Sequence, residues 1–141
     1  MNVQVNTNGF EDAPLKLLRC AVERVLRGAA DQAEVSLTLV SDEEITSLNR
    51  EYLGKDCPTD VIAFNLGDEH VPLGDVYVCV SQAERQAVEL NVSVKEELTR
   101  LAIHGTLHVM GEDHPEGLDR LESPMFVLQE RLLSEVLAGG C

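Results

Sequence analysis

The fold of this chain is decided by the stretch VKEELTRLAIHGTLHVMGEDH, residues 94–114. Ser93 precedes it and a glutamate follows three residues later, which is the capping-box pattern of a helix start. Apolar residues lie on nearly every side of the helix expected over 94–110, and such a helix is usually buried. Gly111 is the residue type that favours the position just past a helix end. The stretch therefore predicts a central, buried helix that stops at a sharp turn.

The same stretch holds three of the four histidines. His104 and His108 are four residues apart, so on a helix they lie on the same face. Gly111 lets the chain reverse, and His114 can then return to the same point. Three imidazole ligands with one open position are typical of a catalytic zinc site. We predict that His104, His108 and His114 bind one divalent metal ion, with zinc favoured, whereas His70 is an ordinary surface residue.

The spacing HxxxHxxGxxH is also that of the metzincin proteases. Those enzymes have glutamate directly after the first histidine, where this chain has Gly105. The usual general base of the motif is therefore missing. Asp113 has two open interpretations, since it could orient a histidine ligand or serve as a turn residue.

Outward from this stretch, hydrophobic periodicity and capping residues predict the remaining elements. The expected strands lie at 3–5, 33–40, 60–66 and 75–80, with 60–66 apolar enough to be fully buried. The expected helices lie at 12–29, 41–54, 81–90, 94–110 and 117–137, with Ser41 and Ser81 as further capping residues. The pattern predicts a single α+β domain over residues 1–141, with about four strands in a mixed sheet packed against about five helices.

The net charge of −14 argues against an indiscriminate binder of polyanions. Four of the eleven basic residues share one face of the first helix, which is either a solvated face or a contact surface for an acidic partner; they are Lys16, Arg19, Arg24 and Arg27. No apolar run reaches the ~20 residues that span a bilayer. The first ten residues lack the features of a signal peptide. We therefore expect a cytoplasmic protein without a membrane partner, whose four dispersed cysteines are free thiols.

Three blocks of the sequence resemble the YbeY family, single-domain bacterial metalloproteins. The blocks occur in the family's order and are EELTRLAIHGTLHVMGEDH (96–114), LNREYLGKDCPTDVIAF (48–64) and PLGDVYVCV (72–80). The resemblance implies a zincin-like metal helix and a metal-dependent endoribonuclease that acts on single-stranded rRNA. It also implies roles in rRNA maturation and ribosome quality control, with ribosomal or assembly proteins as further partners.

The resemblance implies, in addition, a basic residue from 48–55 that neutralises charge on the scissile phosphate. Many members have arginine directly after the tyrosine, where this chain has Leu53, and Arg50 is therefore our candidate. Thr59 with Asp60, and Gly74 with Asp75, are expected to organise the backbone, with a place on the cleft floor as the alternative.

Two other functions remain open at this point. One is a metallohydrolase of a peptide or small molecule, which the ligand spacing favours and Gly105 disfavours. The other is a non-enzymatic ribosome assembly factor with a structural metal.

Overall fold

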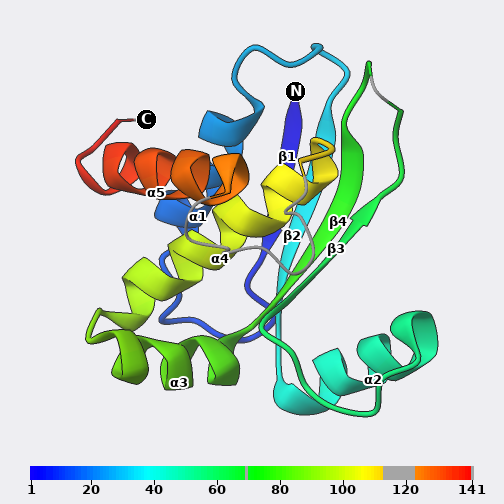
Figure 1. Cartoon of the computed structure of the whole chain (residues 1–141), viewed down its shortest axis with the longest axis vertical. Coiled ribbons are helices and arrows are strands. Elements are labelled where there is room, and N and C mark those ends of the chain that lie inside the picture. The colour runs from blue at the N-terminus through cyan, green and yellow to red at the C-terminus, as the bar shows by residue number, and fades with distance from the viewer. Residues whose placement is uncertain (69, 113–122, 141) are drawn as a thin grey trace.

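Strands and helices alternate along the first half of the chain, and helices follow to its end (Figure 1). The computed structural model describes residues 1–68, 70–112 and 123–140. Its elements are, in order, β1 (Asn2–Asn6), α1 (Leu15–Leu26), β2 (Glu34–Val40), α2 (Asp42–Leu53), β3 (Val61–Asn65), β4 (Leu73–Cys79), α3 (Val80–Leu90), α4 (Val94–Val109) and α5 (Pro124–Leu137).

The sheet has the strand order β1-β2-β4-β3. β1, β2 and β4 are parallel, and β3 pairs antiparallel with β4 at the edge, with Phe64 opposite Asp75. The described residues thus form a four-stranded mixed sheet with five helices, which confirms the α+β prediction.

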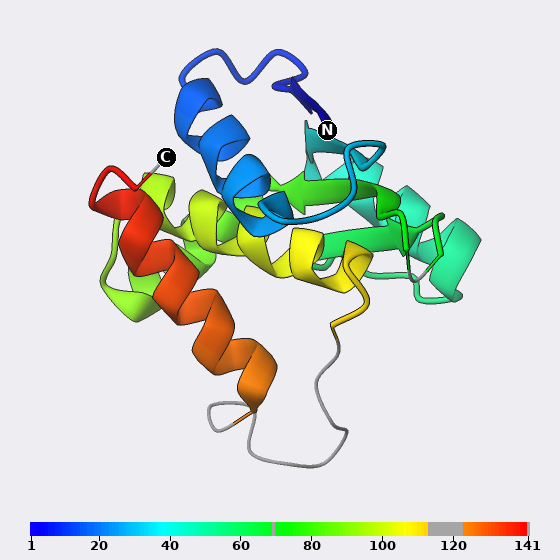
Figure 2. The same ribbon diagram turned by 90° about the horizontal axis from the view of Figure 1, so that it is seen from above.

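One face of the sheet is covered by α4, with α1 and α5 beside it (Figure 2). The main core lies here, where Leu18 and Val22 of α1 and Leu101 of α4 meet Leu37 and Val76 of the sheet. A second core joins α1, α4 and α5. Because α4 is enclosed by the sheet and two helices, its sequence is apolar on nearly every side.

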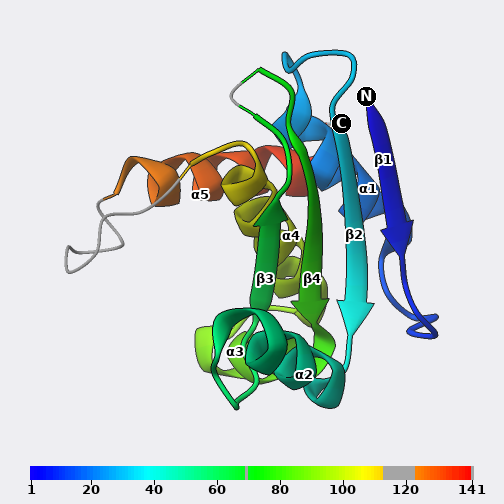
Figure 3. The same ribbon diagram turned by 90° about the vertical axis from the view of Figure 1, so that its right-hand side faces the viewer.

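The other face of the sheet carries α2 at one end only (Figure 3). Ile45 of α2 packs there against Ile62 and Cys79 in a small separate core. The two faces of β3 therefore pack against different cores. Val61 and Ala63 contact the main core, whereas Ile62 contacts the small core beneath α2.

Several predicted boundaries need correction. α3 begins at Val80 and its N-cap is Cys79 without a side-chain bond, so the predicted cap at Ser81 is wrong. β3 is an edge strand with only Ile62 buried, so full burial of 60–66 is also wrong. By contrast, Ser41 and Ser93 cap α2 and α4 as predicted. α5 ends at Leu137 as predicted, and 117–122 lies outside the described residues.

Two further expectations concern the environment of the protein. Within the described residues, no helix has both the length and the apolar character needed to cross a bilayer. Cys57 and Cys79 are free thiols, whereas Cys20 is disulfide-bonded, so the prediction of free thiols is wrong for Cys20.

Candidate metal centre

His104 and His108 lie side by side on α4, one turn apart. Their Nε2 atoms are 3.2 Å from each other, and their ring centroids are 4.7 Å apart at 79°. Both side chains are half-buried. The structure therefore brings together two of the three predicted ligands.

The spacing of the two nitrogen atoms fits a shared metal ion. Zinc–nitrogen bonds of 2.0–2.1 Å at a tetrahedral angle separate two ligand nitrogens by about 3.3 Å. The observed 3.2 Å is close to that value. The pair could thus bind one ion with little movement of either side chain.

The C-terminus of α4 turns sharply just after the second histidine. Gly111 has φ +91°, a conformation that glycine adopts without strain. The Gly111 N–H donates to His108 O (3.0 Å) and the Glu112 N–H to Leu107 O (2.9 Å), which is the Schellman pattern. The predicted role of Gly111 is thereby confirmed.

His114 and Asp113 lie outside the described residues. In the parts of the chain that the structure does describe, His, Cys, Asp and Glu side chains form no group of three that could hold a metal. The role of His114 as third ligand therefore stays a prediction.

Gly105 is the point at which α4 approaches the sheet most closely. A Cβ at this position would lie 2.4 Å from Cγ1 of Val76 and 3.1 Å from Cγ2 of Val61. Since real Cβ atoms do not approach other atoms that closely, any side chain here would push the helix off the sheet. A glutamate at the metzincin position would therefore clash with the packed sheet.

Gln129 is a site residue that sequence reasoning missed. It is 5% exposed on α5, and its Oε1 lies 2.6 Å from Nδ1 of His104. A usable signal was present, because Gln129 interrupts an apolar stripe formed by Met125, Leu132, Leu133 and Val136. A buried polar residue on such a stripe needs a hydrogen-bond partner.

A group of charged residues lies next to Gln129 between α4 and α5. Arg100 contacts Glu97, Glu96 (3.3 Å) and Glu130 (3.0 Å). Burial acts to lower the pKa of Arg100, but the hydrogen bonds that it donates to Glu130 and Glu97 outweigh burial, so the pKa lies above its usual value. Arg100 is therefore fixed in its charged form and joins the two helices behind the histidine pair.

Arg50 is not brought together with the histidines. It lies on α2, which packs on the face of the sheet opposite to α4 (Figure 3). Its guanidinium is exposed and contacts Asp56 at 2.5 Å. Its predicted contact with a scissile phosphate has no support from this arrangement and stays a prediction.

Asp60, just before β3, and Gly74, in β4, act on the backbone around them. Asp60 Oδ1 accepts from the Val61 N–H at 2.8 Å, which organises the turn into β3 as predicted. A Cβ on Gly74 would lie 2.3 Å from Phe64 O and 2.8 Å from the Val109 side chain. Gly74 thus allows β3 and α4 to approach β4 closely.

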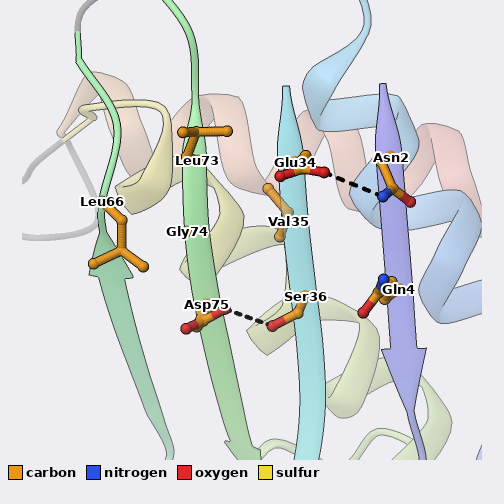
Figure 4. A pocket seen from close by; sticks show the side chains of 9 residues that line it. All are labelled: Asn2, Gln4, Glu34, Val35, Ser36, Leu66, Leu73, Gly74 and Asp75. Carbon is orange, nitrogen blue, oxygen red and sulfur yellow. Dashed lines mark hydrogen bonds between the residues drawn. The ribbon is translucent and has the colours of Figure 1, made fainter. Parts of the chain in front are cut away.

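Asp75 faces away from the histidines, into a pocket of about 300 Å³ on the open face of the sheet (Figure 4). Its Oδ1 accepts from the Ser36 hydroxyl at 2.7 Å, and Asn2 donates to Glu34 at 3.3 Å. The full lining is Asn2, Gln4, Glu34, Val35, Ser36, Leu66, Leu73, Gly74 and Asp75. None of these residues belongs to the predicted metal site.

The remaining predicted features are surface residues. His70 is exposed in the loop between β3 and β4, as expected. On the basic face of α1, Arg24 contacts Glu135 of α5 at 2.6 Å and Arg19 donates to Val3 O at 2.8 Å. Arg19 and Arg24, two of the four basic residues on this face, therefore contact other parts of the same chain.

Comparison with known proteins agrees with this arrangement. The family model described as "Endoribonuclease YbeY" matches residues 2–137. The Endoribonuclease YbeY of Bacillus subtilis is 44% identical over 129 residues, which cover 83% of this chain and 80% of the relative. That of Persephonella marina is 39% identical over 128 residues, which cover 86% and 82%.

A solved structure also matches. The solution structure of a Thermotoga maritima protein has a TM-score of 0.69 and 32% identity, and the match covers 97% of this chain and 90% of that one. The chain belongs to the YbeY family.

Proposed function

We propose that this protein is a metal-dependent endoribonuclease that cleaves single-stranded rRNA. The observation that carries the proposal is the His104–His108 pair, whose Nε2 atoms are 3.2 Å apart. The proposal also rests on the family, whose curated members are called endoribonucleases.

In this proposal His104, His108 and His114 hold one divalent ion, with zinc favoured. Such an ion acts as a Lewis acid on a phosphoryl oxygen. The two described histidines would present Nε2 to the ion, and Gln129 Oε1 would accept a hydrogen bond from the Nδ1–H of His104. Gly111 ends α4 with φ +91°, and in this proposal His114 beyond it completes the ligand set.

We propose Arg50 as a cation that binds the RNA backbone. Its side chain is 59% exposed and its partner Asp56 is 73% exposed, so the pair is open to exchange with an RNA phosphate. Because α2 lies apart from the histidine pair, the expected contribution is to substrate binding rather than to the cleavage step.

The biological setting follows the family resemblance. We propose that the substrate is rRNA during maturation and ribosome quality control in the cytoplasm, with ribosomal or assembly proteins as further partners. The net charge of −14 supports the need for a protein partner, since the chain itself attracts RNA weakly.

Hydrolysis of peptides is the function that the packing disfavours most directly. The zincin mechanism uses the glutamate after the first histidine as general base. Here that position is Gly105, whose Cα faces Val76 and Val61.

The test is cleavage of single-stranded rRNA by the purified protein, compared with His104→Ala and His70→Ala. His104→Ala removes one of the paired ligands, and His70→Ala is a control for the loss of a histidine from an exposed loop. We expect the wild type and His70→Ala to cleave equally, and His104→Ala to lose both cleavage and bound metal. Equal cleavage by all three proteins would overturn the proposal. Loss of metal without any wild-type cleavage would favour an assembly factor.

A further inference from the structure

Gln129 occupies a position that would normally be apolar. It lies on the core-facing stripe of α5 and is 5% exposed. Replacing an apolar side chain by an unbonded amide in such a place costs free energy, so the amide must be fully hydrogen-bonded.

Both ends of the Gln129 amide are bonded. Nε2 donates to Oε2 of Glu130 at 3.1 Å, and Oε1 is 2.6 Å from Nδ1 of His104. A carboxylate accepts hydrogen bonds and does not donate them, so the amide nitrogen must face Glu130. The amide oxygen is then left for His104, and an amide oxygen can only accept.

The tautomer of His104 follows from this orientation. Nδ1 must carry the proton that it donates to Gln129. In the neutral ring the lone pair is then on Nε2, the atom that faces Nε2 of His108. The hydrogen bond thus leaves the correct nitrogen available for a metal ion.

The orientation of Gln129 is itself fixed by a second layer of contacts. Arg100 donates from Nε to Oε2 of Glu130 at 3.0 Å and from Nη2 to Oε1 at 3.3 Å. Arg100 also contacts Glu97, which is 1% exposed. Rotation of the Gln129 amide would place its oxygen against the Glu130 carboxylate, and the Arg100 contacts prevent Glu130 from moving away.

We propose that Gln129 is a positioning residue that selects the metal-binding tautomer of His104. The inference rests on the proposed metal site and names the residue of α5 on which that site depends. Groups that hydrogen-bond to a histidine ligand typically change metal affinity by about 10–100-fold.

The experiment measures the zinc(II) affinity of the purified full chain by competition with a chromophoric chelator. Gln129→Met removes the acceptor while keeping an unbranched side chain. The matched control is Gln86→Met, since Gln86 is a half-buried glutamine that donates to Glu97 (3.0 Å) and Asp60 (3.4 Å) and not to His104 or His108. We expect Gln129→Met to bind zinc about 10–100-fold more weakly than the wild type, and Gln86→Met to bind it as the wild type does.

A second variant keeps the test decisive if Gln129→Met folds poorly. Gln129→Glu combined with Glu130→Gln retains an oxygen that accepts from Nδ1 and places a neutral amide beside it, so this double variant should bind zinc more tightly than Gln129→Met. Circular dichroism of the metal-free proteins measures folding separately from affinity. Equal zinc affinity in Gln129→Met and wild type would overturn the inference, as would equal losses in Gln129→Met and Gln86→Met, or no recovery in the double variant Gln129→Glu/Glu130→Gln.

The same titration separates this inference from the proposed function. His104→Ala is included, and it should lose zinc binding altogether. If His104→Ala binds zinc as the wild type does, the metal site itself is wrong. If His104→Ala loses zinc while Gln129→Met keeps it, only the role of Gln129 is wrong.

Discussion

Gly105 decides how near α4 lies to the sheet, because an added Cβ would meet Val76 at 2.4 Å and Val61 at 3.1 Å. We expect Gly105→Ala to destabilise the protein by about 1–3 kcal/mol, the usual cost of overpacking. Helix propensity alone would favour alanine by up to about 1 kcal/mol, so net destabilisation identifies the clash with Val76. Urea unfolding of the variant measures the change.

The companion variant is Val76→Ala, which removes the Cγ1 atom that a Cβ would meet at 2.4 Å. In the Val76→Ala protein, Gly105→Ala should lower the free energy of unfolding by clearly less than it does in the wild type. A double-mutant cycle gives the coupling free energy between the two positions. Additive effects of the two changes would contradict the steric explanation.

Arg50 is the residue whose proposed role is least supported by its position. We expect Arg50→Ala to raise KM for single-stranded rRNA several-fold and to leave kcat nearly unchanged, because α2 lies apart from the histidine pair. Steady-state kinetics separate the two constants.

Arg85→Ala is the matched control for Arg50→Ala. Arg85 is similarly exposed, at 49%, and contacts a carboxylate of Asp42 at 2.8 Å. A loss of kcat in Arg50→Ala alone would return Arg50 to the cleavage step, and equal effects of the two variants would indicate a general charge effect.

At the scale of elements, α4 and α5 are joined by the ion pairs of Arg100. Arg100→Met would leave the Glu97 carboxylate, 2% exposed, without its charged partner. Breaking a buried pair by removing one side typically costs about 3–5 kcal/mol, and we expect the lower end because Gln86 still donates to Glu97. Chemical denaturation gives the value.

Arg131→Met, on the exposed side of α5, controls for the loss of an arginine and should stay within about 0.5 kcal/mol. Adding Glu97→Gln to Arg100→Met should recover part of the loss because the buried charge is removed. No recovery would show that Arg100 acts by packing its side chain instead.

The elements were predictable from the sequence where their patterns are local. Amphipathic periodicity located α1 and α2, and the Ser41 capping box is present as predicted. α4 was recognised as buried because it is apolar all round. The His104–His108 pair followed from helix geometry alone.

Other features depended on tertiary contacts that no local pattern encodes. β3 carries apolar residues on both faces because α2 covers one and α4 the other, so it was predicted to be fully buried although it lies at an edge. α3 follows β4 without a loop, so its cap was misplaced at Ser81. The contact of Gln129 with His104 joins residues 25 apart, and only the interrupted stripe of α5 hinted at it.

At the scale of the whole molecule, a bound ion would stabilise the fold by mass action. At 100 times its dissociation constant, a ligand that binds only the folded chain contributes about 2.7 kcal/mol. We therefore expect zinc to raise the melting temperature of the wild type by several degrees and a strong chelator to reverse the rise. Differential scanning calorimetry measures both.

His108→Ala should melt at the same temperature with and without zinc, since one of the paired nitrogens is gone. A zinc-dependent rise that persists in this variant would place the stabilising ion elsewhere.

The packing of Gly105 also bears on how this fold can evolve. A GGA or GGG glycine codon becomes a glutamate codon by one base change, so the zincin base is within easy mutational reach. A lineage that acquired Gly105→Glu would lose the close packing of α4 on the sheet, because Val76 and Val61 fill the space that the new side chain needs. Smaller residues at positions 76 and 61 would have to be acquired before the glutamate. Those changes would lower the stability of the fold before the glutamate could contribute to catalysis. In this chain, the contact between α4 and two valines therefore opposes a change toward the glutamate-based chemistry of peptide hydrolysis.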